Sequence, residues 1–327
     1  MSGGLSEGVS DDASIAVAAT EERPPEAKAT RRAKAHPFDY SAKGSMRLVF
    51  ALAALFLYAP IVMLVVFSFN DARRGGNVIW RGFTTDWYAE AFANESLREA
   101  FVNSLAIAAV STVLSVILGA LTAVTLWRFR FPGKPVYEGV VALPIVIPEI
   151  CLGVALAIFF SASGLAVPYD APWPFNLANI IAAHVTFSFP FAAVVIRTRL
   201  GSFNREIEES ARDLGASEWQ VFRDMLLPHM RPGLIAGALL AFTLSLDDFV
   251  ITFFTSGPNT VTFPVKVYSM VRFSVTPEIN AASTVLIALT LVLTAIAIRL
   301  QRNAVEGRDA AGERHAAGER HAAEGGR

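Results

Sequence analysis

The stretch FVNSLAIAAVSTVLSVILGALTAVTLW, residues Phe101–Trp127, contains no Asp, Glu, Lys or Arg. About 20 apolar residues are enough for a helix to cross a hydrocarbon layer roughly 30 Å thick. Within such a layer every backbone amide needs a partner inside the protein, and this stretch is too long and too evenly apolar for a barrel strand. It therefore predicts a membrane-spanning helix.

Five further windows share this apolar character. Leu48–Phe69, Leu177–Ile196 and Ile279–Ile298 lack charge, Gly139–Ser163 holds only Glu149, and Pro232–Val265 holds only Asp247 and Asp248. Over all 327 residues, 17% are charged and the mean hydropathy is +0.44, whereas about 25% of a soluble domain is charged. We therefore expect an all-α integral membrane protein with six transmembrane helices, which argues against a soluble enzyme or a nucleic-acid-binding protein.

Lys and Arg concentrate in alternate loops. Six lie in 1–45, three in 127–136, six in 197–232 and six in 299–327, against four in 70–100, none in 164–176 and two in 266–278. Positive charge marks the cytoplasmic side of a membrane protein. Both termini are therefore expected in the cytoplasm.

The two ends of the chain are polar and flank a six-span domain over residues 46–300. Residues 1–45 are expected to form a disordered tail without a signal peptide, because the first apolar stretch begins too far into the chain. Residues 301–327, a low-complexity tract, are expected to form a second disordered tail. The single Cys151 lies inside the third window, so neither a disulfide framework nor a thiolate metal site is expected.

The loop over residues 203–232 is expected to begin with a short helix. Glu206, Glu208 and Glu209 crowd its start, where negative charge complements the helix dipole. Gly215 then stands where a C-terminal glycine ends a helix.

A second short helix is expected to follow in the same loop. Ser217 and Gln220 have the spacing of a capping box, the helix carries Trp219, and it is expected to stop at Pro228 before Pro232 opens the fifth span. Such an aromatic-bearing elbow serves either as a docking surface for another protein or as a hairpin packed on its own bundle. The physical pattern alone leaves both interpretations open.

The same loop resembles the EAA loop of ABC importer permeases. That motif reads Glu-Ala-Ala, three residues, Gly, nine residues, Ile-x-Leu-Pro, and this chain departs from it only at Ser210 and Met225. In the family the loop forms the coupling helix that seats on the ATPase subunit. The resemblance implies ATPase coupling for Glu209, Ala211, Gly215, Glu218, Leu227 and Pro228. For Glu218, compensation of the helix dipole is an equal alternative.

Further segments narrow the resemblance. Phe83–Tyr88, Ser245–Val250, Pro264–Val271 and Val275–Ala281 are similar to the second permease subunit of spermidine/putrescine importers, and the similarity covers roughly 46–300. It implies a type I importer fold in a prokaryotic plasma (inner) membrane. The partners it implies are a homologous second permease, an ABC ATPase dimer and an external or periplasmic polyamine-binding protein. The loop Ser161–Asn176 is longer than is usual in the family, which bears on contact with the binding protein.

A phosphate-binding Gly-x-x-x-x-Gly-Lys-Ser/Thr loop is missing from the chain. Its Gly133-Lys134 pair is followed by Pro135, and Arg128 stands where the first glycine belongs. The chain is therefore not expected to hydrolyse ATP by itself, so either a partner supplies ATP or an ion gradient drives transport. The resemblance to the EAA loop implies the former: a transporter permease subunit rather than an enzyme, with no cofactor of its own and with ATP and Mg bound by the partner ATPase. A proton-coupled secondary carrier is the alternative from another class, and it would leave the EAA loop without a function.

Glu149, Asp247 and Asp248 are the acids within the predicted spans. Each costs about 2.5–3.5 kcal/mol at a helix centre, so they are expected to line a water-filled path, pair with cations or carry protons. Adjacent helical residues point about 100° apart, whereas Ser245 and Asp248 share a face. One aspartate is thus expected to line the path for a protonated polyamine and the other to bond a neighbouring helix. A structural pair is the alternative role, and another small nitrogen-containing solute is the alternative cargo.

Three other features bear on this path. Pro144 and Pro148 are expected to bend the third span near Glu149. Trp87 is a candidate for cation binding, with interfacial anchoring as the favoured alternative. His184, in the fourth span, is interpreted as a hydrogen-bonding link between helices, ahead of a proton-relay role.

Overall fold

The computed structural model describes residues 43–72, 79–272, 276–296 and 298–299. The two predicted tails lie outside these residues, apart from positions 43–45. The chain divides into two compact units, one ending at Leu57 and one beginning at Tyr58, and α1 (Lys43–Phe67) contributes to both. The site lies in the second unit.

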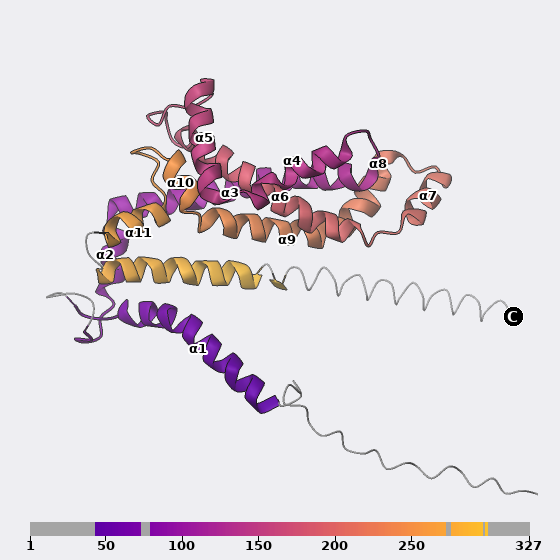
Figure 1. Ribbon diagram of the computed structural model, residues 1–327. Helices are drawn as coiled ribbons and strands as arrows, with labels where there is room; N and C mark the ends of the chain where they lie inside the picture. Colours follow the sequence, from indigo (N-terminus) through magenta and orange to yellow (C-terminus); the bar gives the residue numbers. More distant parts are fainter. Residues whose placement is uncertain (1–42, 73–78, 273–275, 297, 300–327) are drawn as a thin grey trace, which may run out of the picture. The chain divides into compact units, whose positions relative to one another are not determined.

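The regular elements of the described residues are helical (Figure 1). The longer ones are α3 (Glu95–Arg128), α6 (Ala178–Leu200), α9 (Leu227–Leu246) and the helix Pro277–Ile296. The shorter ones are α2 (Asp86–Ala93), α4 (Lys134–Val146), α5 (Glu149–Ser163), α7 (Arg205–Asp213), α8 (Glu218–Val221), α10 (Val250–Thr255) and α11 (Phe263–Val271).

Five helices among the described residues are long and apolar enough to cross a membrane. They are Met46–Phe67, Glu95–Arg128, Phe175–Leu200, Glu218–Leu246 and Pro277–Ile296. The pair formed by α4 and α5 makes a sixth candidate if it is counted as one broken span. The all-helical membrane fold expected from the windows is confirmed, while two of the six windows differ in detail from one continuous helix.

The third window is two helices rather than one. The helices α4 and α5 meet at an angle of 108°, with Ile147 and Pro148 between them. Proline lacks an N–H and its ring collides with the preceding turn, and Pro148 stands at the N-cap of α5. The bend expected from the prolines is therefore confirmed, and it is a full break in the helix.

The fifth window also contains a break, which its uniform hydropathy does not reveal. Helix α9 ends at Leu246, Asp247 is its C-cap, and α10 starts at Val250. The carboxylate of Asp248 accepts hydrogen bonds from the backbone N–H groups of Ile251 and Thr252. Phe249 is the N-cap of α10 and has no capping side chain, so the carboxylate of the preceding Asp248 satisfies the free N–H groups of the first turn, and the chain turns at the aspartates instead of continuing.

The expected helix stop at Pro228 is wrong. Residues Glu218–Leu246 form one helical run, in which Phe222–Leu226 is a π-helical turn. There the Leu227 N–H bonds the Phe222 carbonyl, five residues back. Proline disrupts a helix by its missing donor and its ring, and a wider turn just before Pro228 accommodates both.

The long helices α3, α6 and α9 pack against one another (Figure 1). At Gly119 of α3, an added Cβ would lie 2.9 Å from the backbone nitrogen of Ala193 and 3.0 Å from the Cβ of Ala192. Gly237 of α9 faces the same Ala192 at 3.5 Å. Small residues allow helices to approach closely within a membrane, and here they bring α3 and α9 to one site on α6.

We expect Gly119→Ala to loosen the contact between α3 and α6. The new methyl group meets backbone atoms that cannot move aside, and overpacking costs about 1–3 kcal/mol. The matched control is Gly139→Ala on α4, where an added Cβ has no neighbour within 4 Å. The thermal unfolding midpoint of the detergent-solubilised protein should fall for Gly119→Ala alone. Equal midpoints for the two variants would contradict the close approach.

Candidate functional site

The break between α9 and α10 separates the two aspartates. Asp247 is exposed, whereas Asp248 is buried, so the expectation that they point in different directions is confirmed. Beyond the two backbone N–H groups of α10, Asp248 Oδ2 accepts a bond from Thr252 Oγ1 at 2.8 Å. It also lies 3.3 Å from Nε2 of His184. Asp248 is therefore held inside the protein, and Asp247 is free to face water.

His184 links three helical segments. Its Nδ1 lies 2.7 Å from Ser245 Oγ at the end of α9, and its Nε2 lies 2.8 Å from Thr252 Oγ1 in α10. Ser245 in turn lies 2.9 Å from Ser111 Oγ of α3. The interhelical role expected for His184 is confirmed. Ser111 and Thr252 were not among the predicted site residues. Thr252 lies four positions after Asp248, a spacing at which helical side chains can meet, whereas Ser111 comes from another helix and has no local signal.

Glu149 is exposed and forms the first residue of α5, directly after the break at Pro148. Helix α5 packs on α10. Gly153 makes this possible, because an added Cβ there would lie 3.1 Å from Phe254 Cδ2 and 3.3 Å from Ile251 Cα. Glu149 lies one helical turn before Gly153, and Asp247 and Asp248 directly precede α10, so this packing brings the two ends together. The two helix breaks thus bring the three predicted acids into one neighbourhood, with Glu149 and Asp247 exposed.

Trp87 is half-buried on α2, and its indole Nε1 donates a hydrogen bond to the backbone carbonyl of Asn70 at 2.8 Å. The ring is therefore held against the segment that follows α1. Anchoring of Trp87 at the membrane interface stays a prediction. A role of Trp87 in binding a cation stays a prediction.

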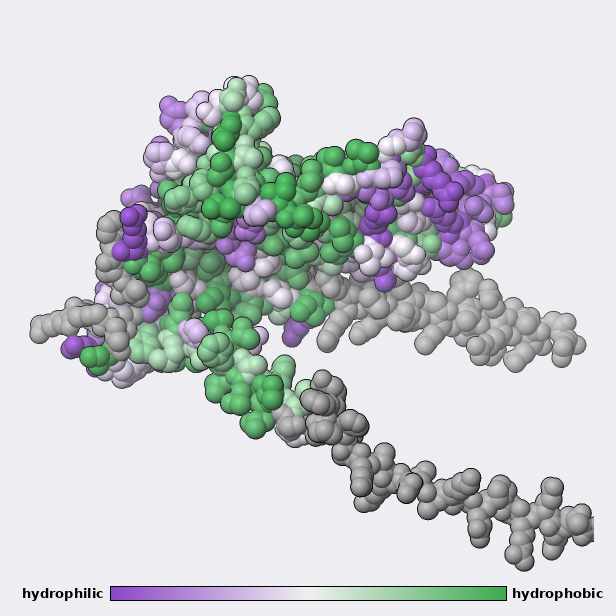
Figure 2. Space-filling view, in the orientation of Figure 1, coloured by the Kyte–Doolittle hydropathy of each residue, from purple (hydrophilic) through white to green (hydrophobic). Residues whose placement is uncertain are grey.

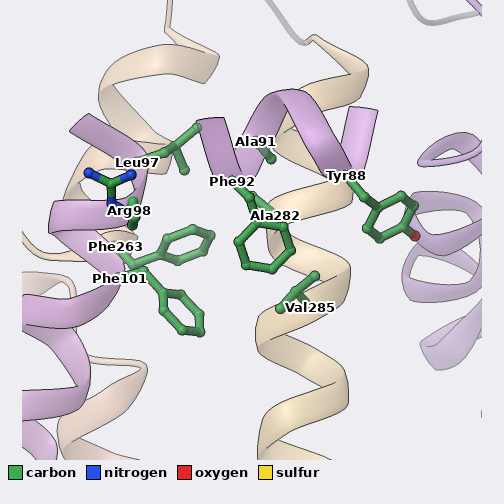
Figure 3. Close-up of a pocket in the computed structure, with 9 residues that line it drawn as sticks. All are labelled: Tyr88, Ala91, Phe92, Leu97, Arg98, Phe101, Phe263, Ala282 and Val285. Carbon is green, nitrogen blue, oxygen red and sulfur yellow. The ribbon is translucent and has the colours of Figure 1, made fainter. Parts of the chain in front are cut away.

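An apolar pocket lies where α2, α3, α11 and the helix Pro277–Ile296 meet. Its lining residues, labelled in Figure 3, are Tyr88, Ala91, Phe92, Leu97, Arg98, Phe101, Phe263, Ala282 and Val285. Phe101 and Phe263 meet edge to face with centroids 5.8 Å apart. Walls of this kind offer no carboxylate to a cation, so the acidic neighbourhood is the better candidate for a polar ligand.

A second functional feature is the elbow, defined here as Arg205–Leu226. Helix α7 ends in a Schellman motif, in which the Ala216 N–H bonds the Ala211 carbonyl and the Gly215 N–H bonds the Arg212 carbonyl. Gly215 has φ +85°, a conformation that favours glycine. The expected C-terminal glycine is therefore confirmed.

The start of the second elbow helix is also as expected. Ser217 and Gln220 form a complete capping box. Trp219 stacks on Phe222, and Trp219 and Leu214 are 65% and 89% exposed. Figure 2 shows hydrophilic residues gathered over α7 and α8, in contrast to the hydrophobic surface of the neighbouring helices. Large exposed apolar side chains on such a surface are typical of a docking site.

Ion pairs fasten the elbow to the end of α3. Arg128 of α3 bonds Glu208 at 2.5 Å and Glu218 at 2.8 Å, and Arg212 pairs with the same two glutamates. The Glu208 side chain is only 8% exposed. From the sequence, Glu208 is expected only to complement the helix dipole, and its pairing with Arg128 could not be predicted because Arg128 lies 80 positions earlier in the chain.

The six positions expected to couple to an ATPase differ in exposure. Glu209 is exposed, Glu218 is largely exposed although ion-paired, Ala211 is buried, and Leu227 and Pro228 are half-buried at the start of α9. The half-buried and buried members contribute to the base of the elbow. Glu209, Glu218 and the turn at Gly215 are the ones that a partner protein can reach.

The proteins to which this chain is similar in sequence are components of transport systems. The family model described as "Binding-protein-dependent transport system inner membrane component" matches residues 111–307. The chain is 38% identical to the spermidine/putrescine transport system permease protein PotC of Escherichia coli K12, over 81% of this chain and 95% of that protein. It is 40% identical to the putrescine transport system permease protein PotI of the same strain, over 80% and 92%.

Solved structures agree on the fold. A bacterial ABC transporter involved in the import of the acidic polysaccharide alginate matches 80% of this chain and 95% of its own, with a TM-score of 0.63 and 21% identity. The MetNI methionine ABC transporter in an inward-facing conformation matches 64% and 99%, with a TM-score of 0.51 and 20% identity. At these identities the likeness extends to the fold alone.

We expect Glu208→Gln to destabilise the elbow. Neutralising this buried carboxylate leaves Arg128 and Arg212 with only the exposed Glu218 as a shared anionic partner, and weakening a buried charged hydrogen bond costs roughly 1–3 kcal/mol. Glu209→Gln, which changes the exposed neighbouring carboxylate, is the matched control. Hydrogen exchange over α7 and α8 should accelerate for Glu208→Gln only, and equal exchange in the two variants would show that the ion pairs do not hold the elbow.

Proposed function

Since the chain belongs to the family of binding-protein-dependent transport system inner membrane components, we propose that it is one transmembrane subunit of an ATP-driven importer of polyamines. The observation that carries this proposal is the 38% identity over 95% of a spermidine/putrescine permease. Putrescine and spermidine are organic cations, so the path through the membrane must favour positive charge.

The acidic neighbourhood supplies that preference. Asp247 and Glu149 are exposed where two spans are broken, and Asp248 adds charge from a buried position. Acidic groups that face a water-filled cavity are the usual mark of a cation path in a membrane protein. A primary ammonium group can pass between Asp247 and Glu149, with Ser245 and Trp87 as further candidates along the path.

The elbow supplies the contact with an ATPase. The exposed Trp219 and Leu214, together with the exposed Glu209, form a mixed apolar and charged surface on a rigid turn. Because Arg128 ties this surface to α3, a displacement of the elbow is passed to a long helix that packs on α6 and α9. ATP and Mg are bound by that partner, and its closure moves the helices through the elbow.

In this proposal both termini face the cytoplasm, since the elbow and the basic loops lie on that side. A homologous second permease completes the path, two ATPase copies bind the two elbows, and an external polyamine-binding protein delivers the cargo. Alternating access then follows from the ATPase cycle.

The test is uptake of labelled spermidine and putrescine by cells that lack their own polyamine importers and express this chain with its three partners. We expect uptake that one of the polyamines competes and neutral amino acids do not. A partner ATPase with an inactivated catalytic site is the control, and it should abolish uptake. If the assembled complex takes up no polyamine, the cargo is another small nitrogen-containing solute. If uptake continues without ATPase activity, the protein is a secondary carrier instead.

We expect Gly215→Val to uncouple ATP hydrolysis from uptake. The added side chain has no neighbour within 4 Å, so the substitution acts through the left-handed backbone, which costs L-residues about 1–2 kcal/mol. The ATP hydrolysed per polyamine imported should rise severalfold in reconstituted vesicles.

Gly133→Val is the matched control for this prediction. Gly133 has φ +86° and an equally open surrounding, but it lies at the start of α4 outside the elbow. The amount of ATP hydrolysed per polyamine imported should be the same for Gly133→Val as for the unmodified complex. A normal stoichiometry for Gly215→Val would count against the elbow as the coupling element.

A further inference from the structure

Five polar side chains form a buried cluster where α9 gives way to α10. They are Ser111, His184, Ser245, Asp248 and Thr252, and their exposed fractions lie between 0% and 8%. Buried polar groups destabilise a protein unless they are hydrogen-bonded, and a buried charge does so far more. Each of these five has a partner within the cluster.

With a neutral His184 ring, the donors and acceptors of the cluster match one another. The single hydroxyl hydrogen of Thr252 is donated to Asp248 Oδ2, so Thr252 Oγ1 can only accept from His184 Nε2 at 2.8 Å. In the neutral ring Nδ1 is then an acceptor, and it receives the Ser245 hydroxyl at 2.7 Å. Ser245 Oγ in turn accepts from Ser111 at 2.9 Å. The imidazole is the central link of this chain.

The same cluster determines which way the two aspartates point. Asp248 accepts from the Ile251 and Thr252 N–H groups and from the Thr252 hydroxyl, so its carboxylate is turned into the protein. Asp247 precedes it directly and is exposed. Because adjacent positions of a turning backbone face different directions, fixing Asp248 inward also fixes Asp247 outward.

We propose that His184 is a positioning residue for cation transport: it clamps the end of α9 to α10, keeps Asp248 buried and so presents Asp247 to the path. This inference rests on the proposed function for its link to transport, while the clamp itself concerns only this chain. It assigns different roles to the two aspartates. Asp247 meets the ammonium group, and Asp248 maintains the break that exposes it.

Loss of the imidazole has a defined consequence. Ser245 and Thr252 lose their common partner, and the Asp248 carboxylate loses the imidazole nitrogen that lies 3.3 Å from it. A buried carboxylate with fewer partners is drawn towards water, and the turn at 247–249 then rotates. Asp247 moves away from the path as Asp248 replaces it.

The first measurement is the concentration dependence of polyamine uptake for His184→Ala and His184→Gln. A glutamine amide can accept from Ser245 and donate to Thr252, so it should retain most of the clamp. We expect His184→Ala to raise KM roughly tenfold, as the loss of a hydrogen bond to a charged group does, with a smaller change in the maximal rate. His184→Gln should restore most of the affinity. Thr186→Val is the matched control, since that hydroxyl bonds only a carbonyl of its own helix in the described contacts.

The second measurement needs no substrate. Cys151 is the single cysteine of the chain, so a Cys151→Ser, Asp247→Cys variant carries one reporter thiol at the position of interest. Its labelling by a membrane-impermeant cationic thiosulfonate should slow about fivefold when His184→Ala is added, a population shift of the size one lost hydrogen bond produces. Adding His184→Gln or Thr186→Val should leave the rate close to that of the parent.

The outcomes separate the two proposals. If the unmodified protein takes up no polyamine and labelling still slows with His184→Ala, the proposed cargo is wrong, whereas the proposed role of His184 is supported. If the parent transports while His184→Ala leaves both KM and labelling unchanged, the clamp is refuted.

Should His184→Ala fail to assemble, Thr252→Val carries the same test, because it removes only the hydroxyl between His184 and Asp248. Unchanged KM and labelling in Thr252→Val would refute the clamp equally.

Discussion

The constraint on which this structure depends is that polar groups inside an apolar bundle must find their partners within the chain. Hydrocarbon offers no hydrogen bonds, so an unsatisfied backbone or side-chain group there costs several kcal/mol. Continuous helices satisfy the constraint over most of α3, α6 and α9. Where the helices break, at Pro148 and at Asp247–Phe249, the chain has to supply other partners. The three acidic residues of the predicted spans, Glu149, Asp247 and Asp248, lie at these two breaks.

The two breaks satisfy the constraint in different ways. At the first, proline removes the donor that would otherwise be left unpaired, and the chain turns by 108°. At the second, the carboxylate of Asp248 takes the free N–H groups of α10, and His184 from α6 completes its surroundings. Close packing of α5 on α10 at Gly153 then joins the breaks into one acidic neighbourhood. The hydrogen bonds that satisfy the backbone N–H groups of α10 therefore also orient the Asp248 carboxylate.

The elbow also combines local backbone caps with side-chain contacts from a distant helix. Its two helices are ended and started by local signals, the Schellman turn at Gly215 and the capping box at Ser217. Its attachment relies on long-range ion pairs, in which Arg128 of α3 reaches Glu208 and Glu218. An element built in this way can keep its own shape while it follows the movement of the helix that carries it.

The features that depend on local chemistry could be predicted from the residues alone. Uniform apolar windows predicted the helices, Pro148 predicted the bend, and Gly215 and Ser217 predicted the elbow turns, because hydropathy, a missing N–H and a left-handed φ act within a few residues. Three outcomes became visible only in the folded chain: α9 ends at Asp247, the helical run continues through Pro228, and Asp248 faces inward while Asp247 is exposed. The contacts around Asp248 and Glu208 include His184 and Arg128, which approach from distant parts of the chain, and no local pattern records a partner supplied by packing.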